Sequence, residues 1–172
     1  MDTSTVIESI STLFSEAYRG PAGPASPWFI ENEPNSGVLG IIADISSDEA
    51  SWSSKPNEPG TSIAGRVEHL RCSLTDANCA LHGKPYEGNW KESWNTDETN
   101  QIKWEKLKKE LQVEFEALLE TIHQQNELKG DCLTGIMALI PYAAYHLGTI
   151  RQLLERARAY AVKISEFDHP KE

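Results

Sequence analysis

Residues 131–166 read DCLTGIMALIPYAAYHLGTIRQLLERARAYAVKISE and form the longest helical pattern in the chain. No Asp, Glu, Lys or Arg occurs within residues 132–150, a length that could cross a membrane. Pro141, Tyr142 and His146 interrupt this apolar run, so we interpret it as the buried helix of a bundle. Apolar side chains recur there in steps of four and three residues, at Ile136, Ile140, Ala143, Leu147, Ile150, Leu154, Ala157 and Ala161.

Three further segments show helical periodicity, at residues 5–19, 61–82 and 96–129. Thr5 and Glu8 have the spacing of a capping box, and Asp131 is the expected N-cap of the last helix. A short amphipathic piece covers residues 38–45, between loops rich in Gly, Pro and Ser. No strand pattern of useful length occurs. The sequence therefore predicts an all-α fold, a four-helix bundle with a short extra helix and long loops between its first two long helices.

The composition of the chain limits the classes of partner that it can bind. Its 172 residues are enough for one domain with a core, which we take to span residues 1–172. The chain has 16 Lys and Arg against 26 Asp and Glu, a net charge of −10, so nucleic acids and anionic membranes are poor partners. Three cysteines are too few for a disulfide framework, and the acidic start of the chain is unlike a secretory signal. We therefore expect a cytoplasmic protein.

Two histidines lie beside the apolar stripes of their helices: His69 precedes Leu70, and His146 precedes Leu147. Two imidazoles that project inward from facing helices could hold a metal ion. The spacing alone favours the alternative, in which each is a partly buried histidine that is hydrogen-bonded to a hydroxyl or a carbonyl. The remaining histidines are interpreted as surface residues: His82, His123 and His169.

Two segments of the chain resemble the DinB/YfiT-like family of helical-bundle proteins. They are SIAGRVEHL at residues 62–70 and YHLGTIRQL at residues 145–153. NWKESW at residues 89–94, with Trp104 and the helix after it, is similar to the family's middle region. Bacterial members of this family include thiol-dependent S-transferases and presumed metal-dependent hydrolases. The resemblance implies a DinB-like four-helix bundle, a metal site and a homodimer.

The metal site that the resemblance implies uses one histidine of the second long helix and an H-x-x-x-H pair on the last. His69 matches the first ligand and His146 the second of the pair, but Tyr142 stands where the third ligand would be. A phenol with an ordinary pKa near 10 is a poor ligand at neutral pH. Pro141 removes a backbone N–H and is expected to bend the helix at this turn. We therefore expect no cofactor, or a weakly bound divalent ion such as Zn²⁺ or Ni²⁺.

Four more residues are candidates for a pocket that includes Tyr142: Cys72, Trp90, Trp94 and Arg151. Cys72 lies one turn after His69 and offers a thiolate to zinc, or packs as a small apolar side chain. Arg151 could bind a ligand carboxylate, or it could pair with an acid such as Glu68. The two tryptophans could line the mouth of a cleft or cover the end of the bundle.

Two classes of function follow. In the first, the chain is a metal-dependent enzyme, a thiol S-transferase or hydrolase that uses His69 and His146. In the second, it has a degenerate metal site and is a small-molecule-binding or stress-associated protein. Tyr142 favours the second class. Apolar positions off the main stripe of the last helix suit the implied homodimer: Met137, Ala144, Tyr145 and Val162.

Overall fold

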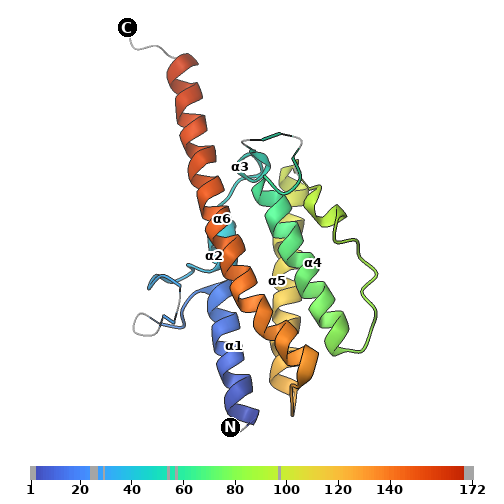
Figure 1. Cartoon of the computed structure of the whole chain (residues 1–172). Helices are drawn as coiled ribbons and strands as arrows, with labels where there is room; N and C mark the ends of the chain where they lie inside the picture. The colour runs from blue at the N-terminus through green and yellow to red at the C-terminus, as the bar shows by residue number, and fades with distance from the viewer. Residues whose placement is uncertain are drawn as a thin grey trace.

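A computed structural model describes residues 3–23, 27–28, 30–53, 55–56, 58–96 and 98–168. Over these residues the fold is all-helical, as the sequence predicts (Figure 1). The described part of the chain contains no strand beyond one isolated bridge between Ser53 and Ser62. The elements are α1 (Thr3–Arg19), α2 (Val38–Ala43), α3 (Ser47–Ser51), α4 (Ile63–Leu81), the 3₁₀ turn η1 (Glu92–Trp94), α5 (Gln101–Gln124) and α6 (Gly130–Asp168).

The four long helices pack around one core. Helices α1 and α4 each contact both α5 and α6. Among the residues described, no Cα atom of α1 lies within 8 Å of one in α4, and none of α5 lies within 8 Å of one in α6. The apolar stripes that the sequence shows face this core except at Ala161, which is exposed, and the fully buried side chains include Leu70, Leu74, Leu111, Leu118 and Ile150.

An aromatic cluster joins α1 to α5. The ring centroid of Phe14 lies 5.1 Å from that of Tyr18 and 5.2 Å from that of Phe115. Tyr18 stacks on Phe115 at 4.9 Å, and all three side chains are fully buried. Large aromatic side chains that are removed from water make the strongest apolar contribution available to a core of this size.

The segment between α1 and α3 is tied to the long helices by two buried hydrogen-bonding groups. Trp104 of α5 is fully buried, and its Nε1–H donates a 2.6 Å hydrogen bond to the carbonyl oxygen of Ile45. The carboxylate of Glu16 accepts hydrogen bonds from the backbone N–H groups of Trp28, at 2.9 Å, and Ile30, at 2.8 Å. Because Glu16 is only 3 % exposed, these bonds compensate for the loss of water around its charge.

Two of the expected helix starts are wrong by a few residues. Helix α1 begins at Thr3, so Thr5 lies inside it and cannot be the N-cap of a capping box with Glu8. Asp131 lies in the first turn of α6 and not at its N-cap. An acidic side chain in the first turn still interacts favourably with the helix dipole.

The region before α5 also differs from expectation. Helix α5 begins at Gln101 and not near residue 96, because the side chain of Asn100 accepts a hydrogen bond from the N–H of Lys103 at 3.0 Å. Asp97, expected in the first turn of this helix, lies outside the described residues. The capping box of the chain is formed instead by Ser46 and Glu49 at α3, within a stretch expected to be loop.

Helix α6 is apolar enough and long enough, over Gly130–Ser165, to cross a membrane by length and composition, and no other helix in the described ranges is. The core helix of a soluble bundle passes the same test. Its burial is less complete than we expect from the sequence, because 28 % of the most apolar window is buried. Side chains 158–165 are all exposed, and α6 extends beyond the other helices at its C-terminal end (Figure 1).

Candidate functional site

His69 of α4 and His146 of α6 lie together in the interior, with ring centroids 5.6 Å apart. His69 is 6 % exposed and His146 is 1 % exposed. Both face inward from neighbouring helices, as their positions beside the apolar stripes suggest. Of the other histidines, His82 and His123 are exposed, and His169 lies outside the described part of the chain.

The tautomer of His69 follows from its hydrogen bonds. Its Nδ1 lies 2.6 Å from the Oγ of Ser93, and this hydroxyl donates its only hydrogen to the carbonyl oxygen of Trp90 at 2.7 Å. Ser93 must therefore accept from His69, so the hydrogen of the neutral imidazole is on Nδ1. The Nε2 atom of His69 keeps a free lone pair, the arrangement that orients an imidazole for a metal ion or a donor group.

The two tryptophans that we expect near the site do contact His69. Trp94 stacks on the imidazole with a centroid separation of 3.5 Å, and Trp90 approaches edge-on at 5.4 Å. Trp90 is 39 % exposed, so it forms the rim of the cluster. The backbone N–H of Gly60 donates to the carbonyl of Trp94 at 3.0 Å, and the Trp94 ring occupies the space that a Cβ at residue 60 would need.

Tyr142 occupies the position of the third ligand that the family resemblance implies. Its ring lies 4.6 Å from that of His146 and 5.7 Å from that of His69. Helix α6 continues through Pro141, so this proline does not move the turn out of reach of His69. Burial raises the pKa of Tyr142 to about 12, although Arg66 opposes the shift. The phenol is therefore protonated at neutral pH and is a hydrogen-bond donor.

Arg66 is the charged group of this cluster, and it is absent from the residues that the sequence indicates as candidates. Arg66 lies on α4, one turn before His69. Its guanidinium is 5.0 Å from the centroid of the Trp94 ring. The Nε of Arg66 and the Nδ1 of His146 are buried atoms without a hydrogen-bond partner. The spacing of three residues between Arg66 and His69 was the available signal, because such pairs share a helix face.

Burial and Arg66 together determine the charge of both imidazoles. Burial, with a smaller contribution from Arg66, lowers the pKa of His69 to about 4. Burial is also the largest cause at His146, followed by the charges of Arg66 and His69, and together they lower the pKa of His146 to about 3. Both imidazoles are therefore neutral at pH 7, and the positive charge of the cluster is carried by Arg66.

Cys72 is buried beside this region, but its thiol is not activated. Its Sγ donates to the carboxylate of Glu68 at 3.4 Å and accepts from Arg71 at 3.5 Å. Burial raises the pKa of the Cys72 thiol above its ordinary value, so the thiolate is disfavoured at neutral pH.

Arg151 lies outside the histidine cluster. It donates to the carboxylate of Glu31 at 2.6 Å and to the carbonyl of Ser36 at 2.8 Å. Its acidic partner is therefore Glu31 and not Glu68, which pairs with Arg71 at 2.6 Å. Arg151 holds the segment before α2 against α6.

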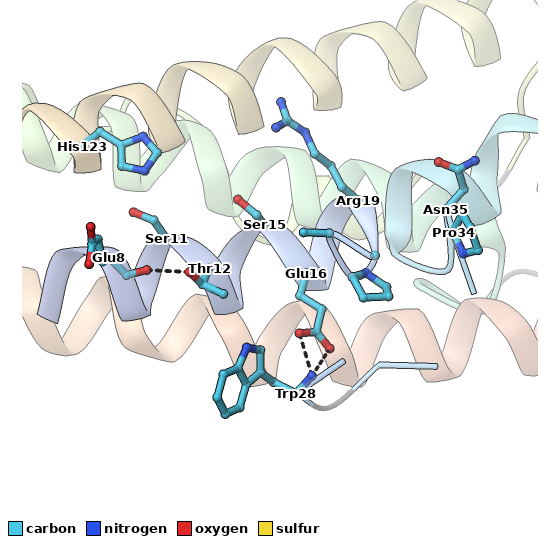
Figure 2. A pocket seen from close by; sticks show the side chains of 13 residues that line it. Glu8, Ser11, Thr12, Ser15, Glu16, Arg19, Trp28, Pro34, Asn35 and His123 are labelled. Carbon is cyan, nitrogen blue, oxygen red and sulfur yellow. Dashed lines mark hydrogen bonds between the residues drawn. The ribbon is translucent and has the colours of Figure 1, made fainter. Parts of the chain in front are cut away.

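A separate pocket of about 610 Å³ lies along α1 (Figure 2). Side chains of α1, among them Glu8, Ser11 and Glu16, line it together with Trp28 and His123. Figure 2 shows the carboxylate of Glu16 directed at the backbone of Trp28, the contact that holds this loop. No residue of the histidine cluster lines this pocket.

The two buried imidazoles predict how stability depends on pH. In the unfolded chain their pKa values return to about 6.5, whereas in the folded chain they are about 4 and about 3. Between these values the unfolded state binds more protons, so stability is lost as the pH falls below about 6.5. Each histidine adds a slope of up to about 1.4 kcal/mol per pH unit.

Urea unfolding between pH 7 and pH 5 measures this slope. We expect His146→Gln to reduce it by about the contribution of one histidine, and the matched control His123→Gln, on the exposed face of α5, to leave it unchanged. Equal slopes in the unaltered protein and in His146→Gln would contradict the assignment of a buried neutral imidazole.

Comparison of the chain with protein-family models, with curated proteins and with solved structures finds no match.

Proposed function

We propose that this chain is a small-molecule-binding protein built on a DinB-like four-helix bundle, with a metal site reduced to His69 and His146. The ring of contacts among α1, α5, α4 and α6 supports the bundle. The observation that carries the function is the position of Tyr142: a protonated phenol stands 4.6 Å from the ring of His146, where a third imidazole would complete a metal site.

The donor set at the cluster does not fit a catalytic metal ion. A catalytic zinc normally has three protein ligands and a water molecule. Here two neutral imidazoles are available, and the pKa of about 12 keeps the Tyr142 phenol protonated. Among the described residues, no group of three or more His, Cys, Asp or Glu side chains could hold a metal ion. The charge of Arg66 also repels a divalent cation at short range.

The same groups suit a small organic molecule. Trp90, which is 39 % exposed, offers an apolar ring surface, while Tyr142, Arg66 and the imidazoles offer hydrogen-bonding atoms. Ligand sites typically combine apolar walls with a few fixed polar groups. The partial exposure of Trp90 provides a side from which a ligand can approach.

A second candidate is the metal-dependent enzyme, an S-transferase or hydrolase. The hydrogen bond from His69 to Ser93 favours it, because it fixes the tautomer whose Nε2 can bind a metal. The buried Nδ1 of His146 also lacks a partner. In this alternative Zn²⁺ or Ni²⁺ binds the two imidazoles with solvent as the remaining ligands.

Elemental analysis combined with ligand titration separates these two functions. We expect the purified protein to contain much less than one equivalent of Zn²⁺ or Ni²⁺. In a set of small aromatic molecules, charged and neutral, a ligand of the site should shift the indole N–H resonance of Trp94. The indole of Trp104, which is fully buried in the core, is the internal control.

Two results would contradict the proposed function. One is about one equivalent of metal that is lost in His69→Ala or His146→Ala, which would make the enzyme the leading candidate. The other is a set of molecules of which none shifts the Trp94 resonance.

We also propose that the chain acts as a cytoplasmic homodimer. Exposed apolar side chains on α6 support the dimer: Met137 at 52 %, Tyr145 at 64 % and Val162 at 59 %. Ala144, which belongs to the same expected set, is partly buried within the chain.

A further inference from the structure

Arg66 is the partly buried one of two arginines, with Arg156, that have no acidic partner among the described residues of α1, α4 and α6. Four arginines pair with carboxylates there: Arg19 with Glu116, Arg71 with Glu68, Arg151 with Glu31 and Arg158 with Glu49. Arg156 is exposed to water. Arg66 is partly buried, and its Nε has neither water nor a hydrogen-bond partner. A buried donor without a partner costs free energy, so a guanidinium in this state indicates a missing acceptor.

The groups around Arg66 would all favour an anion as that acceptor. Trp94 of η1 faces the guanidinium, and the other side chains of the cluster, His69, His146 and Tyr142, offer no acidic group to pair with it. Among the described contacts of this cluster there is no carboxylate. The guanidinium is partly buried beside these rings, and partial removal of water strengthens an ion pair.

His146 provides a second, independent indication of a ligand. Its side chain is 1 % exposed, and its Nδ1 has no hydrogen-bond partner. The ring lies 5.8 Å from Trp94, on which Arg66 is also positioned. Two buried polar groups from two helices thus lack partners at the same aromatic side chain.

We propose that Arg66 and His146 together bind the carboxylate of a small, flat monoanion whose apolar body lies against Trp90, the partly exposed ring of the cluster. This inference rests on the proposed binding function and names its ligand class. One guanidinium balances one negative charge, so the site suits a monoanion better than a phosphate dianion. The planar fork of arginine also matches the two oxygens of a carboxylate.

Benzoate and benzamide test this inference, because they share a shape and differ in charge. Titration at pH 7 by calorimetry, with the Trp94 indole resonance recorded in parallel, gives both affinity and location. We expect benzoate to bind at least about tenfold more tightly than benzamide and inorganic phosphate not to displace it. A hydrogen bond to a charged group is worth about 1.5–3 kcal/mol, which corresponds to roughly ten- to hundredfold in affinity.

Variants of two arginines locate the effect. We expect Arg66→Gln to reduce benzoate affinity to that of benzamide, and the exposed matched control Arg156→Gln to leave it unchanged. Without ligand, Arg66→Gln should also raise the pKa of His146, measured from the imidazole resonances, because a nearby positive charge is removed. This second measurement detects a misfolded variant, in which the pKa of His146 would return to that of an exposed histidine.

Each contrary outcome has a distinct meaning. If benzamide shifts the Trp94 resonance as strongly as benzoate does, the carboxylate inference is overturned and the binding function stands. If neither compound binds, the carboxylate inference is overturned, and the proposed function depends on the wider set of molecules. If Arg66→Gln lowers stability and benzoate does not bind, the guanidinium pairs with an acid of the chain itself, which also overturns the inference.

Discussion

Replacing Tyr142 by histidine is expected to raise the affinity for Zn²⁺ or Ni²⁺ by at least about a hundredfold, since even a group that only hydrogen-bonds to a metal ligand is worth about 10- to 100-fold in affinity. The three rings of Tyr142, His146 and His69 already have centroids 4.6, 5.7 and 5.6 Å apart. Three imidazoles on a tetrahedral zinc, with Zn–N bonds of about 2.0–2.1 Å, have centroids roughly 5 Å apart. The existing spacing is thus close to that of a complete site.

Isothermal titration with Zn²⁺ measures this gain, and Tyr145→His is the matched control. Tyr145 lies on the same helix but is 64 % exposed, so a histidine there should add little affinity. Combining Tyr142→His with Arg66→Gln should raise the affinity further, because the repelling charge is removed. Equal zinc affinity in Tyr142→His and in the unaltered protein would show that the turn at Pro141 does not allow the third ligand.

Replacing Trp104 by alanine is expected to destabilise the protein by about 3–5 kcal/mol. The side chain is fully buried, and its Nε1–H satisfies the carbonyl of Ile45, so the substitution leaves both a cavity and an unpaired acceptor. Trp104→Phe should cost about 1–3 kcal/mol, since it keeps most of the ring and loses the donor.

The free energy of unfolding in urea measures these effects. Ile102→Ala is the control on the same helix, because Ile102 is 83 % exposed and its removal should change stability by about 0.5 kcal/mol or less. A loss below about 1 kcal/mol in Trp104→Ala would contradict the view that Trp104 joins α5 to the segment after α2.

The long helices could be predicted because burial alone requires their patterns. Residues such as Leu70, Leu74 and Ile150 recur at helical spacing, and each has to face the core whatever the loops do. The pairing of His69 with His146 could be predicted for the same reason. Each histidine lies beside the apolar stripe of its helix. Because that stripe packs against the neighbouring helices, the histidine beside it also faces a neighbouring helix.

The rest of the site depends on segments without such a pattern. Ser93 and Trp94 reach His69 through η1, a three-residue turn whose position is determined by tertiary contacts, among them Gly60 against Trp94. Trp94 was expected near the site, but no periodicity relates Ser93 to His69. The sequence places Arg66 one turn before His69, but only the three-dimensional structure shows that Arg66 has no acidic partner among the described residues.

Short elements were missed for a related reason. Helix α3 has five residues, fewer than two turns, so no apolar periodicity can reveal it. Its capping box of Ser46 and Glu49 was the local signal. At α5 the helix begins after the N-cap Asn100 and not near residue 96, and the choice between these two starts depends on how the preceding loop crosses Ser51, which bonds to Thr99.

The exposed C-terminal end of α6 is stabilised in a different way from the packed part of the chain. The helix has 39 residues, about 58 Å at 1.5 Å per residue, and residues 161–165 lie exposed beyond the contacts of Arg158 with Glu49 and of Tyr160 with Trp52. A free peptide of that length would have to nucleate a first turn, with a statistical weight near 10⁻³ that corresponds to about 4 kcal/mol. Here the packed half is already the nucleus, so each further residue needs only the favourable propagation that Ala, Arg and Lys provide. The end therefore lengthens and shortens turn by turn with temperature, as a one-dimensional helix–coil system attached to a cooperatively folded core.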